Sequence, residues 1–445
     1  MKVKCLVRNP DDYMRETKKD IFKMPRNYDP DLHPFAAPRE YTRAMNAAKL
    51  GRMFAKPFVG SLDGHRDSVT CLSKHPSRLS QLYTGAADGE VRIWDLARMR
   101  CLRTVQAHEG YIRAMTHTND GAAFLTVGDD KTVKRWRSGE LEYGEEDEPE
   151  NTILLRTIVT SISHAVGRAE FATCGETCHI WDESRNEPVK TFSWGVDSLS
   201  CVRYNPVETH VLGACASDRS VILYDTREQQ PIRRVTTQLR SNVIAWNPME
   251  AFVFTAANED YNLYSWDMRR LQRPLLIHKD HVSAVIDVDY SPTGREFVSG
   301  GYDKTLRIFG AREPRSRDIY HTRRMQRITC VCWTGDDKYV LSGSDEMNIR
   351  LWKARASEKL GVVKERERAA RQYNERLVEK FASHPQVSRI ARHRQVPRQV
   401  LTGKKEQRAI HQSQKRKEAN RRAHSRPGTV PRVAEKDKFV LKEEE

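Results

Sequence analysis

The feature that most constrains the fold of this chain is an internal repeat. Seven segments end in the same way, with a turn that carries an acidic residue and a short alternating strand that closes on an aromatic side chain. The fullest copy is DGEVRIWD at 88–95, and a degenerate one is GETCHIWD at 175–182. The closing aromatics are Trp94, Trp136, Trp181, Tyr224, Trp266, Phe309 and Trp352, at spacings of 42, 45, 43, 42, 43 and 43 residues. A period of about 40–45 residues with this ending is typical of four-stranded propeller blades.

Seven such units resemble the WD-repeat family. The sequence therefore predicts an all-β fold, a seven-bladed WD-repeat β-propeller over residues 61–353. An extended N-terminal arm (1–60) precedes it, and a basic α-helical, Sof-like C-terminal region (354–445) follows. Seven blades close a ring, so we expect the residues just before Gly64 to supply the outer strand of the last blade.

Three blades carry a recurring polar set: a histidine near the start, a serine or threonine, and an aspartate in the last turn. A buried histidine can bridge the carboxylate and the hydroxyl and so satisfy all three groups. The remaining blades lack one or more of these groups, and we expect them to rely on packing alone. The structural blade residues are His65, Asp88 and Trp94 in blade one, His108, Asp130 and Trp136 in blade two, and His281 and Asp303 in blade six.

The net charge of +16 is unevenly distributed along the chain. Residues 1–60 carry +6 and residues 354–445 carry +13, which leaves −3 for the predicted propeller. Much of that negative balance lies in ELEYGEEDEPE at 140–150, which is expected to form a surface loop. The chain therefore consists of a slightly acidic body with two basic arms.

Several function classes find no support in the sequence. No motif of a metalloprotease, a serine hydrolase, a phosphate-binding loop or a dinucleotide-binding turn is present, so we expect no catalytic residue and no cofactor. Neither the histidines nor the nine cysteines have metal-site spacing, and the cysteines are interpreted as buried, reduced thiols of a reducing compartment. No run of 18 apolar residues and no secretory leader occurs, which argues against a membrane partner. A small-molecule substrate is not expected either.

The C-terminal region is predicted to be helical in two parts. Residues 355–382 carry Leu360, Val363, Ala370, Tyr373, Leu377 and Phe381 as a stripe at helical spacing, ended by Pro385. Such a stripe fits docking on the propeller or on a partner equally well. The segment 402–428 can form a second helix up to Pro427, but it is too poor in apolar residues to bury a core alone.

Two interpretations of this basic segment remain open. It is either a solvated, partly disordered tail or a surface for RNA and acidic partners, because cationic side chains that neutralise phosphates release counterions whatever the base sequence. No aromatic side chains are interleaved to stack on bases. The candidate RNA contacts are Arg389, Arg392, Arg394, Arg398, Arg421, Arg422 and Arg426. The candidate nuclear localisation residues are Lys404, Lys405, Lys415, Arg416 and Lys417.

Longer stretches of the sequence resemble one group of WD-repeat proteins, the Sof type. The stretches are NYDPDLHPF, REYTRAMNAAKL and FAKPF in the N-terminal arm, WNPMEAFVFTAANEDYNLY at 246–264, DHVSAVIDVDYSPTGREFVSGGYDK at 280–304, GSDEMNIRLWKARASEKLG at 343–361 and RIARHRQVPR at 389–398. The resemblance implies a nucleolar protein of the small-subunit processome, associated with the box C/D small nucleolar ribonucleoprotein that guides early pre-rRNA cleavage. In vertebrates the same family also has a name as a substrate receptor of cullin-4 RING ubiquitin ligases.

The ligase role implies its own residues. Such receptors use a blade that ends in Trp/Tyr-Asp-x-Arg to bind the ligase adaptor, and two consecutive blades end in this way. The candidate adaptor contacts are Tyr224, Asp225 and Arg227, then Trp266, Asp267 and Arg269. An arginine at this place also arises by chance in an ordinary blade ending.

The leading hypothesis is a non-catalytic scaffold in the nucleus and nucleolus, needed for pre-rRNA processing and 18S rRNA production. Its propeller would bind processome proteins, and its basic C-terminal region would bind pre-rRNA. The alternative is the ligase receptor, bound to the cullin-4 adaptor. A propeller enzyme is the third possibility, and the repeat register shows no acid, base or metal cluster for it. A chain truncated after Lys353 is expected to fold and to lose sedimentation with pre-ribosomal particles.

Overall fold

The computed structural model describes residues 35–139, 147–193, 195, 198–426 and 428–444. These residues form two compact units. One unit takes the described part of residues 1–57 together with 355–394. The other unit takes 58–354 together with the described part of 395–445. Both ends of the repeat region therefore continue into the smaller unit, and the propeller unit includes the last segment of the chain.

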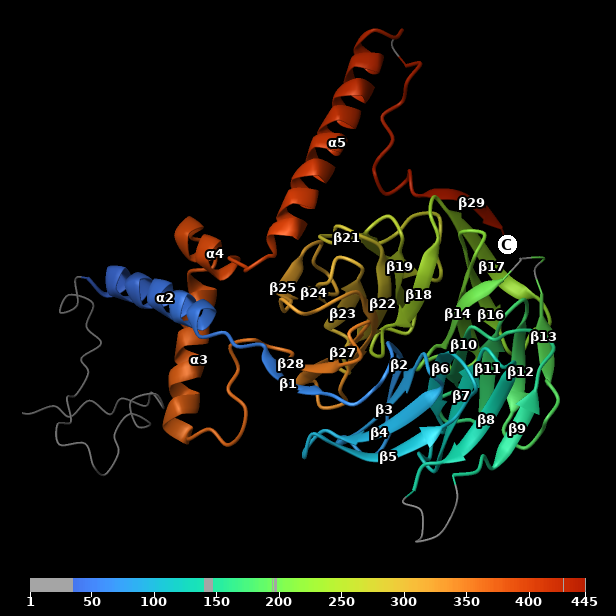
Figure 1. The fold of residues 1–445 in the computed structure, drawn as a ribbon. Coiled ribbons are helices and arrows are strands. Elements are labelled where there is room, and N and C mark those ends of the chain that lie inside the picture. The colour runs from blue at the N-terminus through green and yellow to red at the C-terminus, as the bar shows by residue number, and fades with distance from the viewer. Residues whose placement is uncertain (1–34, 140–146, 194, 196–197, 427, 445) are drawn as a thin grey trace, which may run out of the picture. The chain divides into compact units, whose positions relative to one another are not determined.

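The larger unit is a ring of seven antiparallel sheets, which confirms the predicted seven-bladed propeller (Figure 1). The first strands of the blades are β2 (Val69–Lys74), β6 (Ile112–His117), β10 (Ser161–His164), β14 (Leu199–Tyr204), β18 (Ser241–Trp246), β22 (Val285–Tyr290) and β26 (Ile328–Trp333). Each first strand contacts the first strands of both neighbouring blades, and β26 contacts β2, so these strands form the inner wall of a closed ring.

The remaining strands follow outward in each blade. The second strands are β3 (Gln81–Ala86), β7 (Ala123–Gly128), β11 (Glu170–Cys174), β15 (Val211–Ala216), β19 (Val253–Asn258), β23 (Glu296–Gly301) and β27 (Tyr339–Ser344). The third strands are β4 (Glu90–Asp95), β8 (Thr132–Arg137), β12 (Cys178–Asp182), β16 (Ser220–Asp225), β20 (Asn262–Asp267), β24 (Leu306–Gly310) and β28 (Ile349–Lys353). The fourth strands are β5 (Arg100–Gln106), β9 (Asn151–Leu154), β13 (Lys190–Phe192), β17 (Pro231–Thr237), β21 (Leu276–Lys279), β25 (Ser316–Tyr320) and β1 (Phe58–Leu62).

The N-terminal strand β1 closes the ring, as expected from the sequence. It pairs antiparallel with β28, with Leu62 opposite Ile349 and Ser61 opposite Arg350. Blade seven is therefore built from both ends of the repeat region. We call the face formed by the connections between blades and by the turns from second to third strands the upper face, and the opposite one the lower face.

The seven closing aromatics lie on the seven third strands, and all are buried. In blade two the polar set forms as predicted. Hydrogen bonds of 2.8 Å join His108 to Asp130 and to Thr126, and the Trp136 indole N–H donates to the Thr126 hydroxyl at 3.0 Å. His281 in blade six makes the same two contacts, to Asp303 at 2.9 Å and to Ser299 at 2.7 Å.

The prediction for blade one is wrong in one contact. His65 bonds to Thr84 at 2.7 Å, but its Nδ1 has no hydrogen-bond partner among the described residues. In blade two the Thr132 hydroxyl donates to one oxygen of the aspartate, which leaves the other oxygen directed at the histidine. Blade one has Glu90 in that position, which has no hydroxyl to donate to Asp88, so Asp88 keeps the backbone N–H contact that blade two also has, at 3.1 Å in blade one.

Blades three and seven do not depend on packing alone, which corrects the second expectation about the polar sets for these two blades. In blade three the Trp181 indole N–H donates to Thr173 at 2.8 Å. In blade seven Trp352 donates to Ser342 at 2.9 Å. Both retain the tryptophan-to-hydroxyl contact, because that half of the set needs only the second and third strands.

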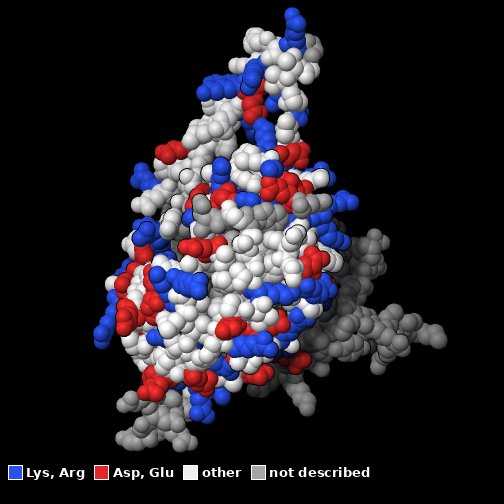
Figure 2. Space-filling model, turned by 90° about the vertical axis from the view of Figure 1, so that its right-hand side faces the viewer, with Lys and Arg blue, Asp and Glu red and all other residues white. Residues whose placement is uncertain are grey.

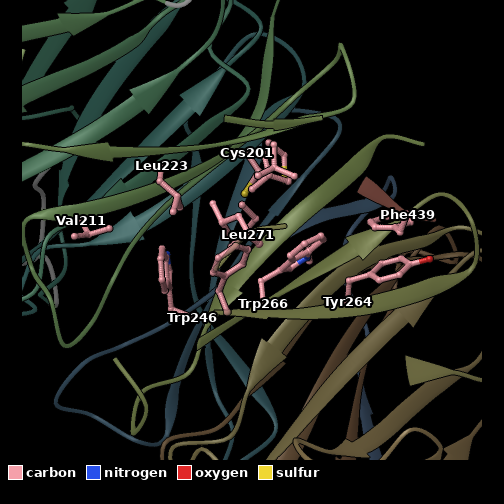
Figure 3. Close-up of a cluster of buried hydrophobic side chains, with 14 of the residues drawn as sticks. Cys201, Val211, Leu223, Trp246, Tyr264, Trp266, Leu271 and Phe439 are labelled. Atoms are coloured by element: carbon pink, nitrogen blue, oxygen red, sulfur yellow. The ribbon is translucent and has the colours of Figure 1, made fainter. Parts of the chain in front are cut away.

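The C-terminal end of the chain returns to the propeller, which the sequence did not indicate. Strand β29 (Val440–Glu444) pairs antiparallel with β17 and makes blade four a five-stranded sheet. Just before it, the buried Phe439 stacks on Tyr264 with ring centroids 3.6 Å apart and lies beside Trp266 at 5.9 Å (Figure 3). The last residues therefore complete the hydrophobic cluster between blades four and five.

The described part of the smaller unit contains three helices: α2 (Ala36–Met53), α3 (Glu365–Lys380) and α4 (Pro385–Ala391). The N-terminal arm was expected to be extended, but its described part contains α2, which packs on both other helices. Ala44 and Ala48, one helical turn apart, are buried there, so small side chains allow the close approach. Pro38 lies in the first turn of α2, where a proline is tolerated.

The predicted apolar stripe of residues 355–382 is partly correct. Leu377 is buried, and the Lys380 ammonium lies 2.6 Å from the Glu40 carboxylate of α2. The partner of α3 is therefore the helix of the N-terminal arm, which neither of the two expected docking modes included. The helix begins only at Glu365, so Leu360 and Val363 lie outside it, and Pro385 begins α4.

Seven of the eight described cysteines are buried, as predicted, but Cys101 is exposed because it lies on the outer strand β5. Cys5 lies outside the described residues. Most of the acidic insertion, residues 140–146, lies outside them as well. No helix of the described residues is long and apolar enough to cross a membrane.

Candidate protein-binding and nucleic-acid-binding surfaces

The two Trp/Tyr-Asp-x-Arg endings fold into the same local structure on the lower face. The Asp225 carboxylate ends β16 and accepts the backbone N–H of Arg227 at 2.9 Å. The guanidinium of Arg227 then returns to the same carboxylate, with its Nε at 3.1 Å and its Nη2 at 2.7 Å. The chain thus closes a short loop in which the aspartate holds both the backbone and the side chain of the arginine.

Blade five repeats this arrangement. Asp267 accepts the Arg269 backbone N–H at 3.0 Å, and the Arg269 guanidinium donates to both carboxylate oxygens at 3.0 and 2.9 Å. The guanidinium also lies over the Phe252 ring, 4.5 Å from its centroid. In each motif the aromatic residue, Tyr224 or Trp266, is buried and contributes to the core rather than to the surface.

The electrostatics of both pairs favour the charged forms. The Arg269 hydrogen bond lowers the pKa of Asp267, against the opposing effect of burial. Burial would raise the pKa of Asp225, but the contacts with Arg227 outweigh it and lower that pKa. About two-thirds of each arginine side chain remains exposed, 64% for Arg227 and 63% for Arg269. Each motif can therefore present a fixed cation to a partner protein without ordering a long side chain on binding.

The basic residues of the C-terminal region lie mainly on α5 (Arg398–Ala423). This helix has nine lysines and arginines against Glu406 and Glu418, which gives it a charge of +7. Only Val400 is buried, so nearly the whole helix faces solvent. In contrast, the outer wall of the propeller in Figure 2 mixes basic and acidic side chains.

The base of α5 is attached to blade six. The Lys404 ammonium lies 2.5 Å from the Asp280 carboxylate, and the Gln407 amide donates to the Val282 carbonyl at 3.2 Å. Burial would raise the pKa of Asp280, but Lys404 outweighs it and lowers the pKa to about 2. Lys404, a candidate localisation residue, is therefore engaged in the fold. Lys405, Lys415, Arg416 and Lys417 are exposed on the helix.

The seven candidate RNA contacts are divided between the two units. Arg389, Arg392 and Arg394 belong to the helical unit, at and after the end of α4. Arg398, Arg421, Arg422 and Arg426 belong to the unit that contains the propeller. Arg422 is half-buried and pairs with Glu418 at 3.1 Å, whereas Arg398, Arg421 and Arg426 are exposed.

Comparisons with known proteins agree with this architecture. Four segments, residues 56–95, 99–137, 272–310 and 319–353, match the WD domain (G-beta repeat), and residues 354–440 match the Sof1-like domain. The molecule is thus a WD-repeat propeller with a Sof1-like C-terminal region.

Full-length relatives define the family more closely. The chain is 60% identical to DDB1- and CUL4-associated factor 13 of Danio rerio and 58% identical to that of Homo sapiens, over 99% of each chain. The protein of the same name from Dictyostelium discoideum is 44% identical over 97% of each chain. The chain belongs to this family of Sof1-type WD-repeat proteins.

The described residues contain no group of three or more potential metal ligands. A small cavity between blades two and three is lined by apolar side chains of the blade core, such as Leu125 and Phe171, and by the half-buried polar side chains of Arg135, Asn151 and Glu183.

Proposed function

We propose that this protein is a non-catalytic scaffold of the small-subunit processome, located in the nucleolus and needed for pre-rRNA processing. The propeller would bind processome proteins and the box C/D small nucleolar ribonucleoprotein. The exposed α5 would bind the pre-rRNA backbone. The observation that carries the proposal is the charge of α5, +7 over 26 residues, on a helix whose base is attached to blade six.

Electrostatics supports the role of α5. Phosphate contacts supply most of the sequence-independent affinity for nucleic acids, and arginine and lysine provide them. Along α5 the exposed cations outnumber the acids, and a solvated helix of this composition gains stability when an anion neutralises it. The Sof1-like domain match covers all of α5, which is consistent with a function shared across the family.

The test should use substitutions rather than truncation. Truncation after Lys353 would remove Phe439 and β29 and so expose Tyr264 and the edge of β17, which are covered in the native fold. We therefore choose the triple charge reversal Lys415→Glu, Arg416→Glu and Lys417→Glu. This variant is expected to fold and to lose most of its co-sedimentation with pre-ribosomal particles.

The matched control reverses three exposed arginines of the lower face, Arg98, Arg100 and Arg185. It changes the net charge by the same amount and is expected to co-sediment like the wild type. Unchanged sedimentation of the α5 variant would show that this helix is not the RNA anchor.

A second function is favoured by the two Trp/Tyr-Asp-x-Arg motifs. We propose that Arg227 and Arg269 bind the adaptor of a cullin-4 RING ubiquitin ligase, with this chain as the substrate receptor. The supporting observation is that two neighbouring blades hold an exposed arginine in the same way, on their own aspartates. The names of the relatives associate those proteins with DDB1 and CUL4.

The double variant Arg227→Ala and Arg269→Ala is expected to abolish co-purification of the adaptor and to leave pre-rRNA processing unchanged. Because both side chains are exposed, the fold should tolerate the change. The control is Arg312→Ala, another exposed arginine of the lower face, which pairs with Glu250 at 3.0 Å. Retained adaptor binding in the double variant would refute this assignment.

A further inference from the structure

A second basic surface lies on the propeller itself, at the upper face of blades six and seven. The connection between β25 and β26, residues 321–327, carries the exposed Arg323 and Arg324. The Lys304 ammonium, from the turn between β23 and β24, donates to Gln326 of this connection at 2.7 Å. Cations from two blades therefore lie on one loop cluster, which we call the crown: Tyr302, Lys304, Arg323, Arg324 and Arg327.

The carboxylates around the crown already have cationic partners. Asp345 pairs with Arg327 at 2.6 Å, and Glu346 pairs with Arg350. Asp303 bonds to His281 and is buried with only 3% of its side chain exposed. In the described part of the chain, Arg323 and Arg324 form neither a hydrogen bond nor an ion pair. Lys304, Arg323 and Arg324 thus remain available to a ligand with negative charge.

The backbone at Lys304 is in a conformation that favours glycine. Its φ angle is 60°, and the corresponding turn of blade one uses Gly89 at 84°. The corresponding turns of blades two, four, five and seven also place a residue with a Cβ atom in this left-handed region, namely Lys131, Arg219, Tyr261 and Met347. The conformation is therefore common to this turn of the repeat, and what Lys304 contributes to the crown is its positive charge.

The crown also contains an aromatic platform. Tyr302 is 44% exposed, and the Arg327 guanidinium lies over its ring at 5.4 Å from the centroid. Exposed aromatic rings among cations are the groups on which unpaired bases stack, whatever their sequence. Acidic proteins would use the cations but have no need of the ring. The combination therefore favours a single-stranded nucleic acid.

Contacts connect the crown to α5. Gln407 of α5 bonds to the Val282 carbonyl, and the Val282 backbone N–H reaches the Asp303 carboxylate at 3.4 Å. Lys304 follows Asp303 directly and reaches the loop 321–327 through Gln326. The base of α5 and the crown are therefore connected through the loops of blade six.

We propose that the crown is a binding site for single-stranded RNA, in which Lys304, Arg323 and Arg324 contact phosphates and Tyr302 stacks on a base. This inference rests on the proposed RNA-binding function and extends it from α5 to the propeller. In this proposal α5 and the crown contact consecutive segments of one RNA strand.

The test measures binding of the full chain to a fluorescent single-stranded oligoribonucleotide at several salt concentrations. In the double variant Arg323→Gln and Arg324→Gln, the slope of log Kd against log salt should fall by about 1.4, because each lost phosphate contact on a single strand contributes about 0.7. Tyr302→Ala should weaken binding by about fivefold or more, and Tyr302→Phe should retain most of the affinity, because the phenylalanine ring still stacks. The variant Lys304→Gly should lower affinity without lowering the unfolding temperature, since it relieves the strained turn.

Matched substitutions of Arg98 and Arg100 by glutamine provide the control, and they should bind RNA like the wild type. Failure of the wild-type chain to bind the oligoribonucleotide would refute the RNA-binding function as a whole. Wild-type affinity in the crown variants, with affinity lost in the α5 triple variant, would refute the crown alone. Loss of an acidic protein partner but not of RNA in the crown variants would likewise overturn it.

Discussion

His65, His108 and His281 occupy the same position in three blades, yet their hydrogen bonds differ. His108 and His281 each bridge an aspartate and a hydroxyl, whereas His65 makes only the bond to Thr84. The cause is the residue two positions after the aspartate, which is Thr132 in blade two and Glu90 in blade one. The sequence motif therefore predicts which residues are buried, but the orientation of the carboxylate depends on a neighbour outside the motif.

This difference has a measurable effect on stability. His108→Ala should reduce the free energy of unfolding by about 1 kcal/mol more than His65→Ala, because it removes one more buried hydrogen bond. Urea denaturation followed by tryptophan fluorescence provides the measurement. Equal losses for the two variants would contradict the assignment of the unpaired Nδ1 in His65.

Buried neutral histidines should make the protein sensitive to mild acid. Burial, reinforced by Arg92, lowers the pKa of His65 to about 4, and burial with the nearby His75 lowers that of His117 to about 3. In the unfolded chain both titrate near their ordinary value of about 6.5. Below that pH the unfolded chain binds protons that the folded chain does not, so the free energy of unfolding falls as the pH drops.

Each of these two histidines should contribute up to about 1.4 kcal/mol per pH unit between about pH 6 and the folded pKa. Unfolding curves measured from pH 7.5 to 5 test this. The variant His117→Gln should show a smaller slope than the wild type. Stability that does not change over this range would contradict the prediction.

At the scale of elements, the C-terminal segment of the chain acts as part of blade four. Phe439 is 4% exposed and stacks on Tyr264. Phe439→Ala should therefore reduce the free energy that holds the C-terminal segment on blade four by about 3 kcal/mol. We expect the tail to leave β17, with faster hydrogen exchange in both β17 and β29. The control is Leu441→Ala, because Leu441 lies in β29, just after Phe439, and is 57% exposed. This variant should show the same hydrogen exchange in β17 and β29 as the wild type.

The helical unit permits a separate test. All eight tryptophans lie between residues 94 and 352, so their fluorescence reports only on the propeller unit. Leu377→Asp places a charge among α2, α3 and α4 and should reduce the circular dichroism at 222 nm without shifting tryptophan emission. The exposed Arg376→Asp should change neither signal. A concerted loss of both signals would show that the two units fold as one.

These elements also mark the limit of sequence-based prediction. The blades could be predicted because each repeat has a closing strand in which apolar and polar residues alternate, and which ends in an aromatic residue. β29 could not, because VLKEE is a short edge strand whose partner lies about 200 residues earlier in the chain. The prolines of the N-terminal arm suggested extended structure, while the small residues that bury α2 against α3 gave no strong helical periodicity.

At the scale of the whole molecule, the excess of positive charge in residues 354–445 predicted a basic region for RNA binding. In the structure the basic residues of this region are divided between two units. α5 belongs to the propeller unit, whereas Arg389, Arg392 and Arg394 belong to the helical unit. The crown could not be predicted from the sequence, because its cations and its tyrosine lie in separate turns that come together only in the folded ring. Patterns within one segment predict helices and strands, whereas surfaces assembled across blades require the three-dimensional fold.

The closure of the ring by β1 has a consequence for biosynthesis. β1 begins at Phe58, and its partner β28 ends at Lys353, so roughly 300 residues are translated between them. At about 5–20 residues per second, β1 leaves the ribosome about 15 to 60 s before its partner. During that interval the nascent chain holds six finished or growing blades and one unpaired strand, a state in which chaperones have the greatest opportunity to act.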